Sequence, residues 1–101
     1  MADLLARSDI DTALAALPGW SVDGDALVKT VQVPGDSQDA LVEAVGRTAD
    51  DMDHHPEVTR EPDAVTFRLW THTAGGVTAK DVDLAARIDA QLSGSATDTA
   101  G

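Results

Sequence analysis

The segment from Val65 to Trp70 constrains the fold more than any other part of the chain. Two sets of side chains alternate along it: Val65, Phe67 and Leu69, and between them Thr66, Arg68 and Trp70. A period of two is typical of a β-strand with one face on a hydrophobic core. The sequence therefore predicts a strand that ends near Thr71 and belongs to a sheet covered on one face.

Three other segments have the pattern of amphipathic helices. Their core-facing residues recur at spacings of three and four: Ile10, Ala13, Leu14 and Leu17; Leu41, Ala44, Val45, Thr48 and Met52; Leu84, Ala85, Ile88 and Leu92. Each segment has candidate capping residues at its start: Ser8 with Asp11, Asp36 or Ser37, and Thr78 with Asp81. These segments predict the helices that cover the sheet.

Two hairpins complete the predicted architecture. Residues 20–22 and 26–33 have β-like composition on either side of Asp23-Gly24-Asp25. A second extended piece follows Pro56 and turns at Glu61-Pro62-Asp63 into the strand described above. The order α-β-β-α-β-β-α predicts a single α+β domain over residues 1–92, a four-stranded antiparallel sheet with three helices packed on one face. Residues 93–101 are small and polar, and predict a flexible C-terminal tail.

The number of large apolar side chains limits the size of the core. Of the hydrophobic residues, seventeen are alanine, which leaves twenty-six larger apolar side chains in 101 residues. Because a small core gives little burial per residue, we expect the chain to self-associate.

The charge balance excludes several partners. Eighteen acidic residues face seven lysines and arginines, which gives a formal net charge of −11. Such a surface repels phosphate backbones and anionic headgroups, so we expect no direct nucleic-acid or membrane binding. No apolar run approaches the roughly 20 residues of a membrane span, and the first ten residues lack the layout of a signal peptide, so we expect a cytoplasmic location. Salt adaptation and biased codon usage both remain open as explanations of the acidity.

Three histidines are the candidates for chemistry, because the chain has no cysteine. His54 and His55 follow the middle helix, and His72 follows the last strand. The second hairpin brings these places together, so the histidines should meet. Neighbouring carboxylates and the negative end of the helix favour protonated imidazole. These carboxylates belong to Asp50, Asp51 and Asp53. Adjacent histidines in extended backbone point to opposite sides, so His54 and His55 should differ in role.

Structural roles compete with this interpretation. A histidine at a helix end can simply be a favourable partner of the helix dipole, with no catalytic role. The spacing of Asp81 from Thr78 favours a capping role for the Asp81 carboxylate. Trp20 and Trp70 can be sheet-packing residues, and Gly75-Gly76 a turn. A zinc site of the three histidines and a carboxylate would lack thiolates and the usual ligand spacing. There is also no G-x-S-x-G elbow and no phosphate-binding glycine loop.

Two motifs resemble a known family. They are Asp50-x-x-x-His54-His55-Pro56 and Thr71-His72-x-x-Gly75-Gly76-x-Thr78-x-x-Asp81, followed by Leu84-Ala85. Together they resemble the pterin-4a-carbinolamine dehydratases, also called 4a-hydroxytetrahydrobiopterin dehydratases, over about residues 4 to 92. The resemblance implies a hydro-lyase of tetrahydrobiopterin recycling that converts 4a-hydroxytetrahydropterin to quinonoid dihydropterin with neither metal nor organic cofactor. The resemblance also implies a homodimer or homotetramer. The alternative that it implies is a non-catalytic dimerisation or assembly factor with the same fold.

The resemblance also implies roles for individual residues. His54 and His72 would be the acid and base, His55 would bind and orient the pterin, and Asp81 would support a histidine. Asp50 would support the site from the end of the helix. The implied pterin pocket consists of Asp53, His54, His55, Pro56, Trp70, Thr71, His72 and Thr73. The chain differs from the family at four positions where aromatic residues are common, and at one where asparagine is frequent: Val31, Val33, Val58 and Pro62, and Asp53.

Overall fold

A computed structural model describes the backbone of residues 4–100 and the side chains of residues 4–92. Its elements are α1 (Arg7–Leu14), β1 (Ser21–Asp23), β2 (Ala26–Gln32), α2 (Gly35–Met52), β3 (Glu57–Glu61), β4 (Ala64–Leu69) and α3 (Ala79–Ala100). This order is the predicted one, and strand ends differ from the prediction by a residue or two. The structure thus confirms a single α+β domain.

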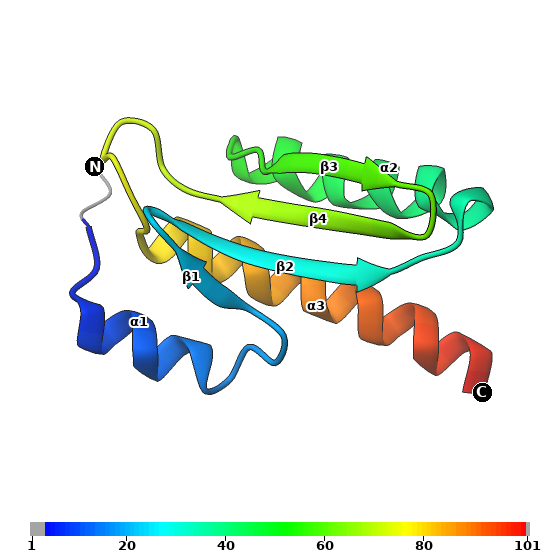
Figure 1. The fold of residues 1–101 in the computed structure, drawn as a ribbon, viewed down its shortest axis with the longest axis horizontal. Coiled ribbons are helices and arrows are strands. Elements are labelled where there is room, and N and C mark those ends of the chain that lie inside the picture. Colours follow the sequence, from blue (N-terminus) through cyan, green and yellow to red (C-terminus); the bar gives the residue numbers. More distant parts are fainter. Residues whose placement is uncertain (1–3, 101) are drawn as a thin grey trace.

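The four strands form one antiparallel sheet in the order β1-β2-β4-β3. The two hairpins lie side by side because β2 pairs with β4 along its length, from Leu27 opposite Leu69 to Gln32 opposite Ala64. Figure 1 shows the helices on one side of the sheet, with α3 running behind the central strands. Among the residues described, no helix lies over the other face of the sheet.

The alternation in β4 separates the two faces as predicted. Val65, Phe67 and Leu69 are fully buried and point toward the helices. They meet α3 through Leu84 and Ile88, which are also fully buried. Between them, Thr66, Arg68 and Trp70 are only half-buried, on the open face. Burial of the larger side chains, at about 1.5–3 kcal/mol each, is what holds the helices on the sheet.

Two of the three predicted helix caps are wrong. Helix α1 begins at Arg7, and its N-cap residue Ala6 makes no side-chain capping bond. Asp11 instead pairs with Arg7 at 3.2 Å, one turn earlier on the same helix, so its carboxylate does not serve a box with Ser8. Helix α2 begins after Pro34, also without a side-chain cap, so Asp36 and Ser37 lie inside its first turn. A fixed proline φ prepares that start without a capping side chain.

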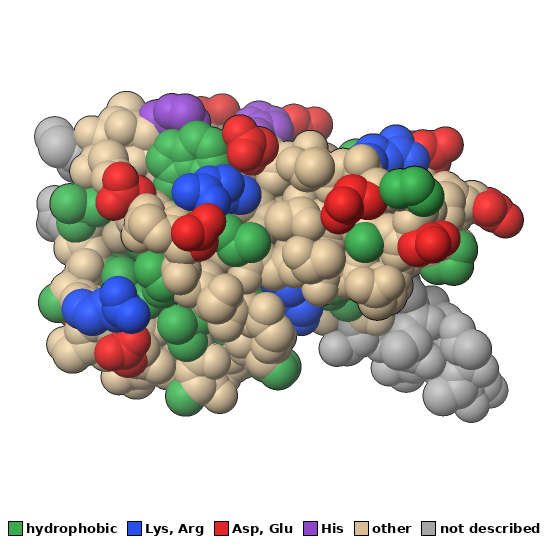
Figure 2. Space-filling model, viewed as in Figure 1, with side chains coloured by type: hydrophobic (Ala, Val, Ile, Leu, Met, Phe, Trp, Pro, Cys, Tyr) green, Lys and Arg blue, Asp and Glu red, His purple; other side chains and the backbone are tan. Residues whose placement is uncertain are grey.

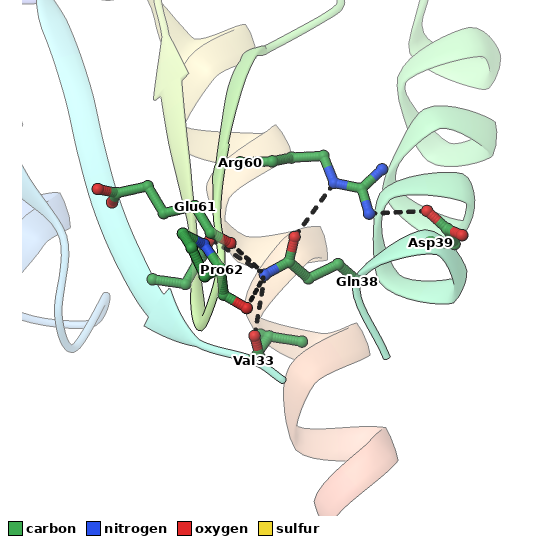
Figure 3. Close-up of polar contacts among 7 residues, drawn as sticks. Val33, Gln38, Asp39, Arg60, Glu61 and Pro62 are labelled. Atoms are coloured by element: carbon green, nitrogen blue, oxygen red, sulfur yellow. Dashed lines mark hydrogen bonds and ion pairs between the residues drawn. The ribbon is translucent and has the colours of Figure 1, made fainter. Parts of the chain in front are cut away.

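A buried glutamine ties the start of α2 to the turn between β3 and β4 (Figure 3). The Nε2 group of Gln38 lies within hydrogen-bond distance of the carbonyl oxygens of Val33 (3.0 Å), Glu61 (2.6 Å) and Ala64 (3.3 Å). Its Oε1 accepts from Nε of Arg60 at 3.2 Å, and the same guanidinium donates to Asp39 at 2.7 Å. Gln38 therefore holds the start of α2 against the end of β2 and the β3–β4 hairpin through its buried amide group.

The last helix is longer than the sequence predicts. Its apolar pattern ends at Leu92, but the helical backbone continues to Ala100. Residues 93–100 therefore have a regular backbone in place of the irregular one expected, while Gly101 lies outside the described residues. Whether this end of the chain is flexible stays a prediction. None of the helices, over the part of the chain described, is long and apolar enough to cross a membrane.

Candidate active site

A left-handed turn at the end of α2 places the first histidine. Asp53 has φ 52° and ψ 42°, and among the described residues it is the one non-glycine with positive φ. This conformation ends the helix and lets the His54 N–H donate to the carbonyl oxygen of Ala49 at 3.0 Å. The chain leaves the helix toward the start of α3. A side chain other than glycine in this region costs free energy, and such strain is often found at functional sites.

The His54 ring contacts a buried carboxylate. Its Nε2 lies 2.6 Å from Oδ1 of Asp81, and the Asp81 side chain has no exposed surface. Oδ2 of Asp81 accepts from the backbone N–H of Thr78 at 2.9 Å and from the hydroxyl of Thr71 at 2.8 Å. The Thr78 hydroxyl oxygen in turn accepts from the backbone N–H of Lys80 at 3.3 Å. This bond and the one from the Thr78 N–H to Asp81 confirm the predicted capping box. Asp81 is thus both a cap and a histidine partner.

This network assigns the tautomer of His54. The carboxylate of Asp81 can only accept, so the Thr71 hydroxyl and His54 Nε2 must donate to it. The Thr71 hydroxyl then accepts from that of Thr78 at 2.8 Å. With Nε2 committed to Asp81, the Nδ1 atom of His54 is left to exchange a proton with a ligand.

His55 has a weaker and more exposed partner. Its Nε2 lies 2.7 Å from Oδ1 of Asp50, with side-chain exposures of 56% and 73% for the pair, against 10% for His54. Water and salt screen an exposed pair of this kind, so it contributes at most about 1 kcal/mol. The two adjacent histidines therefore differ in environment, and the predicted difference in role stays a prediction.

His72 lies in the loop that follows β4. Its ring centroid is 4.7 Å from that of Trp70, with 41° between the planes. The loop turns back through Gly75, which has φ 76°. The backbone N–H of Thr71 donates to the carbonyl oxygen of Gly76 at 2.8 Å. The predicted Gly75-Gly76 turn is confirmed. Trp70 is not a core residue, since it is half-buried on the open face, whereas Trp20 is buried and donates to Asp89 at 2.9 Å.

One cavity of about 370 Å³ brings all three histidines together. It is lined by Asp53, His54, His55, Trp70, Thr71, His72, Thr73 and Lys80. Of the predicted pocket residues Pro56 alone is missing from this lining, while Lys80 was not predicted at all. The sequence signal that could have indicated Lys80 is its position, because it lies two residues after Thr78 in the first turn of a helix that starts at the site. Figure 2 shows histidine side chains at one edge of the molecule with carboxylates beside them.

The site has no cluster of metal ligands. Among the described residues, no three histidine, cysteine or acidic side chains are grouped so that they could hold a metal ion. His54 and His55 instead have separate carboxylate partners, Asp81 and Asp50. The arrangement provides three imidazoles around one cavity, and such an arrangement is suited to proton transfer.

Comparison with known proteins gives a consistent result. Residues 3–91 match the model of the family described as pterin 4 alpha carbinolamine dehydratase. A protein of Nocardia farcinica is 43% identical over 88 residues, 86% of this chain and 93% of its own length, and one of Mycobacteroides abscessus is 43% identical over 91 residues, 88% and 96%. Both are named provisionally as pterin-4-alpha-carbinolamine dehydratases.

A solved structure agrees with these relatives. The crystal structure of a transcriptional coactivator/pterin dehydratase from Brucella melitensis superposes with a TM-score of 0.82 at 31% identity, and the match covers 87% of this chain and 97% of that one. The family match spans both histidine-bearing segments as well as the whole sheet. This chain therefore belongs to the pterin 4 alpha carbinolamine dehydratase family.

Proposed function

We propose that this protein dehydrates 4a-hydroxytetrahydropterin to quinonoid dihydropterin by histidine general acid-base catalysis. The observation that carries the proposal is the buried Asp81–His54 pair at a cavity that His72 also lines. Family membership supports the substrate class, and the pairing supports the type of chemistry. In a cell this activity would return the pterin cofactor of aromatic amino-acid hydroxylases to its recycling path.

The reaction needs one proton donor and one proton acceptor. The C4a–O bond breaks, its electron pair leaves with oxygen, and a proton added to that oxygen completes the water molecule. The N5 lone pair forms the new N5=C4a double bond, and N5 loses its proton. The carboxylate of Asp81 stabilises an imidazolium at His54, so we assign proton removal from N5 to Nδ1 of His54. His72 then protonates the leaving hydroxyl, and His55 orients the ring.

Replacement of either imidazole tests the proposal. His54→Ala and His72→Ala should each lower kcat by about 10²–10⁴, the usual contribution of a positioned acid or base. Arg47→Ala is the control, because Arg47 lies exposed on the same helix as the turn to His54 and pairs only with Glu43. The proposed dehydratase activity would be excluded if the wild-type rate were no faster than the rates of both histidine variants, and if the circular dichroism of the variants matched that of the wild type.

The alternative is an assembly or dimerisation factor. The name of the Brucella melitensis neighbour joins a coactivator to a dehydratase, so one fold is associated with both descriptions. The three histidines in one cavity favour the enzyme, because binding a protein partner does not require them. A stoichiometric partner recovered with the protein, together with no turnover, would favour the alternative. We also propose that the protein is cytoplasmic. We further propose that it forms a homodimer or homotetramer, and analytical ultracentrifugation would test this oligomeric state.

A further inference from the structure

The cations of this protein are almost all neutralised. The chain has seven lysines and arginines, and six of them pair with a carboxylate: Arg7–Asp11, Lys29–Asp89, Arg47–Glu43, Arg60–Asp39, Arg68–Asp23 and Arg87–Asp83. Lys80 is the exception, with no ion pair to any carboxylate that the structure describes. It also lines the cavity of the three histidines. In a chain with eighteen acidic residues, this combination needs an explanation.

The surroundings of Lys80 keep nearby acids away from its ammonium. On α3 the position one turn after Lys80 is Leu84, which is not acidic. Asp83, three residues on, is bound by Arg87 at 3.2 Å. Asp81 is next in sequence, but both of its oxygens are occupied by His54, Thr71 and Thr78. Asp53 lines the same cavity, yet it does not come within ion-pair distance of Lys80. The ammonium is therefore available to a ligand.

We propose that Lys80 is a substrate-positioning residue that donates a hydrogen bond to the C4 carbonyl oxygen of the pterin. An ammonium can only donate, and this carbonyl oxygen is a strong acceptor on the substrate. C4 is bonded directly to C4a, the carbon that loses its hydroxyl. A group that holds the C4 oxygen must consequently lie beside the groups that act at C4a and N5, which is where Lys80 lies relative to the histidines. This inference rests on the proposed function.

The electrostatics of the reaction give Lys80 a distinctive kinetic effect. Positive charge develops on N5 and C4a as the hydroxyl leaves, and an ammonium near C4 opposes that charge. Lys80 therefore contributes to binding of the substrate and not to the chemical step. A contact that is at least as favourable in the ground state as in the transition state lowers KM and does not raise kcat. A charge-assisted hydrogen bond at an exposed site corresponds to about a tenfold change in affinity.

Lys80→Met, Lys80→Arg and Arg47→Met make a matched series. Met keeps the length of the side chain and removes its charge, Arg restores the charge, and Arg47→Met removes an exposed, paired cation from α2 without releasing an acid next to Lys80. We expect KM to rise about tenfold in Lys80→Met, with kcat unchanged or slightly higher, and to recover in Lys80→Arg. Arg47→Met should resemble wild type. Binding of a fully oxidised, unreactive pterin, followed by fluorescence, should weaken by the same factor in Lys80→Met only.

Three outcomes would overturn the inference. If KM and pterin affinity are unchanged in Lys80→Met, the residue does not bind the substrate. If kcat falls at constant KM, Lys80 acts on the reaction and the argument from developing charge is wrong. If Arg47→Met weakens binding equally, the effect is one of net charge. Should wild-type protein bind the oxidised pterin without turnover while Lys80→Met binds it tenfold more weakly, the pterin contact stands and the proposed dehydratase activity fails.

Discussion

Replacement of Asp81 by asparagine separates the two functions of its carboxylate. The amide oxygen of Asp81→Asn can still accept from the Thr78 N–H, which is 2.9 Å from Oδ2 in the wild-type protein. The amide nitrogen would face His54 Nε2, where the carboxylate oxygen now lies at 2.6 Å. An amide N–H donates, so His54 would have to accept at Nε2 and carry its proton on Nδ1. The variant thus keeps the helix cap and reverses the tautomer of the histidine.

The two effects have different magnitudes. Loss of charge-assisted hydrogen bonds lowers the free energy of unfolding, by about 1–3 kcal/mol, and removal of a buried charge offsets part of this loss. Loss of the free Nδ1 acceptor removes the general base, which lowers kcat by about 10²–10⁴. Urea unfolding measures the first quantity and initial rates of 4a-hydroxytetrahydropterin dehydration measure the second.

Gln38→Met is the matched control for this variant. It removes a buried amide at the other end of α2 and leaves carbonyls of the β3–β4 turn without their donor, so it should also cost about 1–3 kcal/mol. Gln38 does not line the cavity, so kcat should remain at the wild-type value at temperatures where the variant is folded. If Asp81→Asn loses no more kcat than Gln38→Met does, Asp81 does not set the tautomer, and the reasoning is refuted.

Three further predictions test other parts of the structure. His55→Ala should raise KM several-fold and lower kcat less than His54→Ala does, because its partner Asp50 is exposed; equal losses of kcat in steady-state assays would contradict this difference. Asp53→Gly should increase the free energy of unfolding by about 0.5–1 kcal/mol by relieving the left-handed strain, and Asp53→Val should decrease it, as urea titration can measure. Molar NaCl should raise the urea midpoint of a chain with net charge −11, and an unchanged midpoint would show that self-repulsion is unimportant.

The order of elements and the core could be predicted because they depend on periodicity. The alternation around Phe67 determines which side of β4 is buried, and the pairing of β2 with β4 confirms it. Helix starts were predicted less well, since a side chain with capping spacing can find another partner. Asp11 pairs with Arg7, and Pro34 starts α2 without a cap, so only the box of Thr78 and Asp81 forms.

The histidine cavity could be predicted in outline, because a hairpin brings its two ends together whatever its length. What the sequence could not predict is which carboxylate each histidine contacts. His54 reaches Asp81, twenty-seven residues away, while His55 returns to Asp50 on the preceding helix. Lys80 was missed for a similar reason. Its significance comes from its having no ion pair with any described carboxylate, and that is a property of the packed structure.

The capping box at the start of α3 affects how related sequences should be interpreted. Asp81 would be needed for the first turn of that helix even in a protein with no catalytic activity, since the Thr78 N–H and the Thr71 hydroxyl both depend on it. A chain of this fold that has lost its histidines would therefore still be under pressure to keep the aspartate. A T-x-x-D motif then indicates a helix start and not an activity, and the histidine that contacts the aspartate distinguishes an enzyme from a protein that retains only the scaffold.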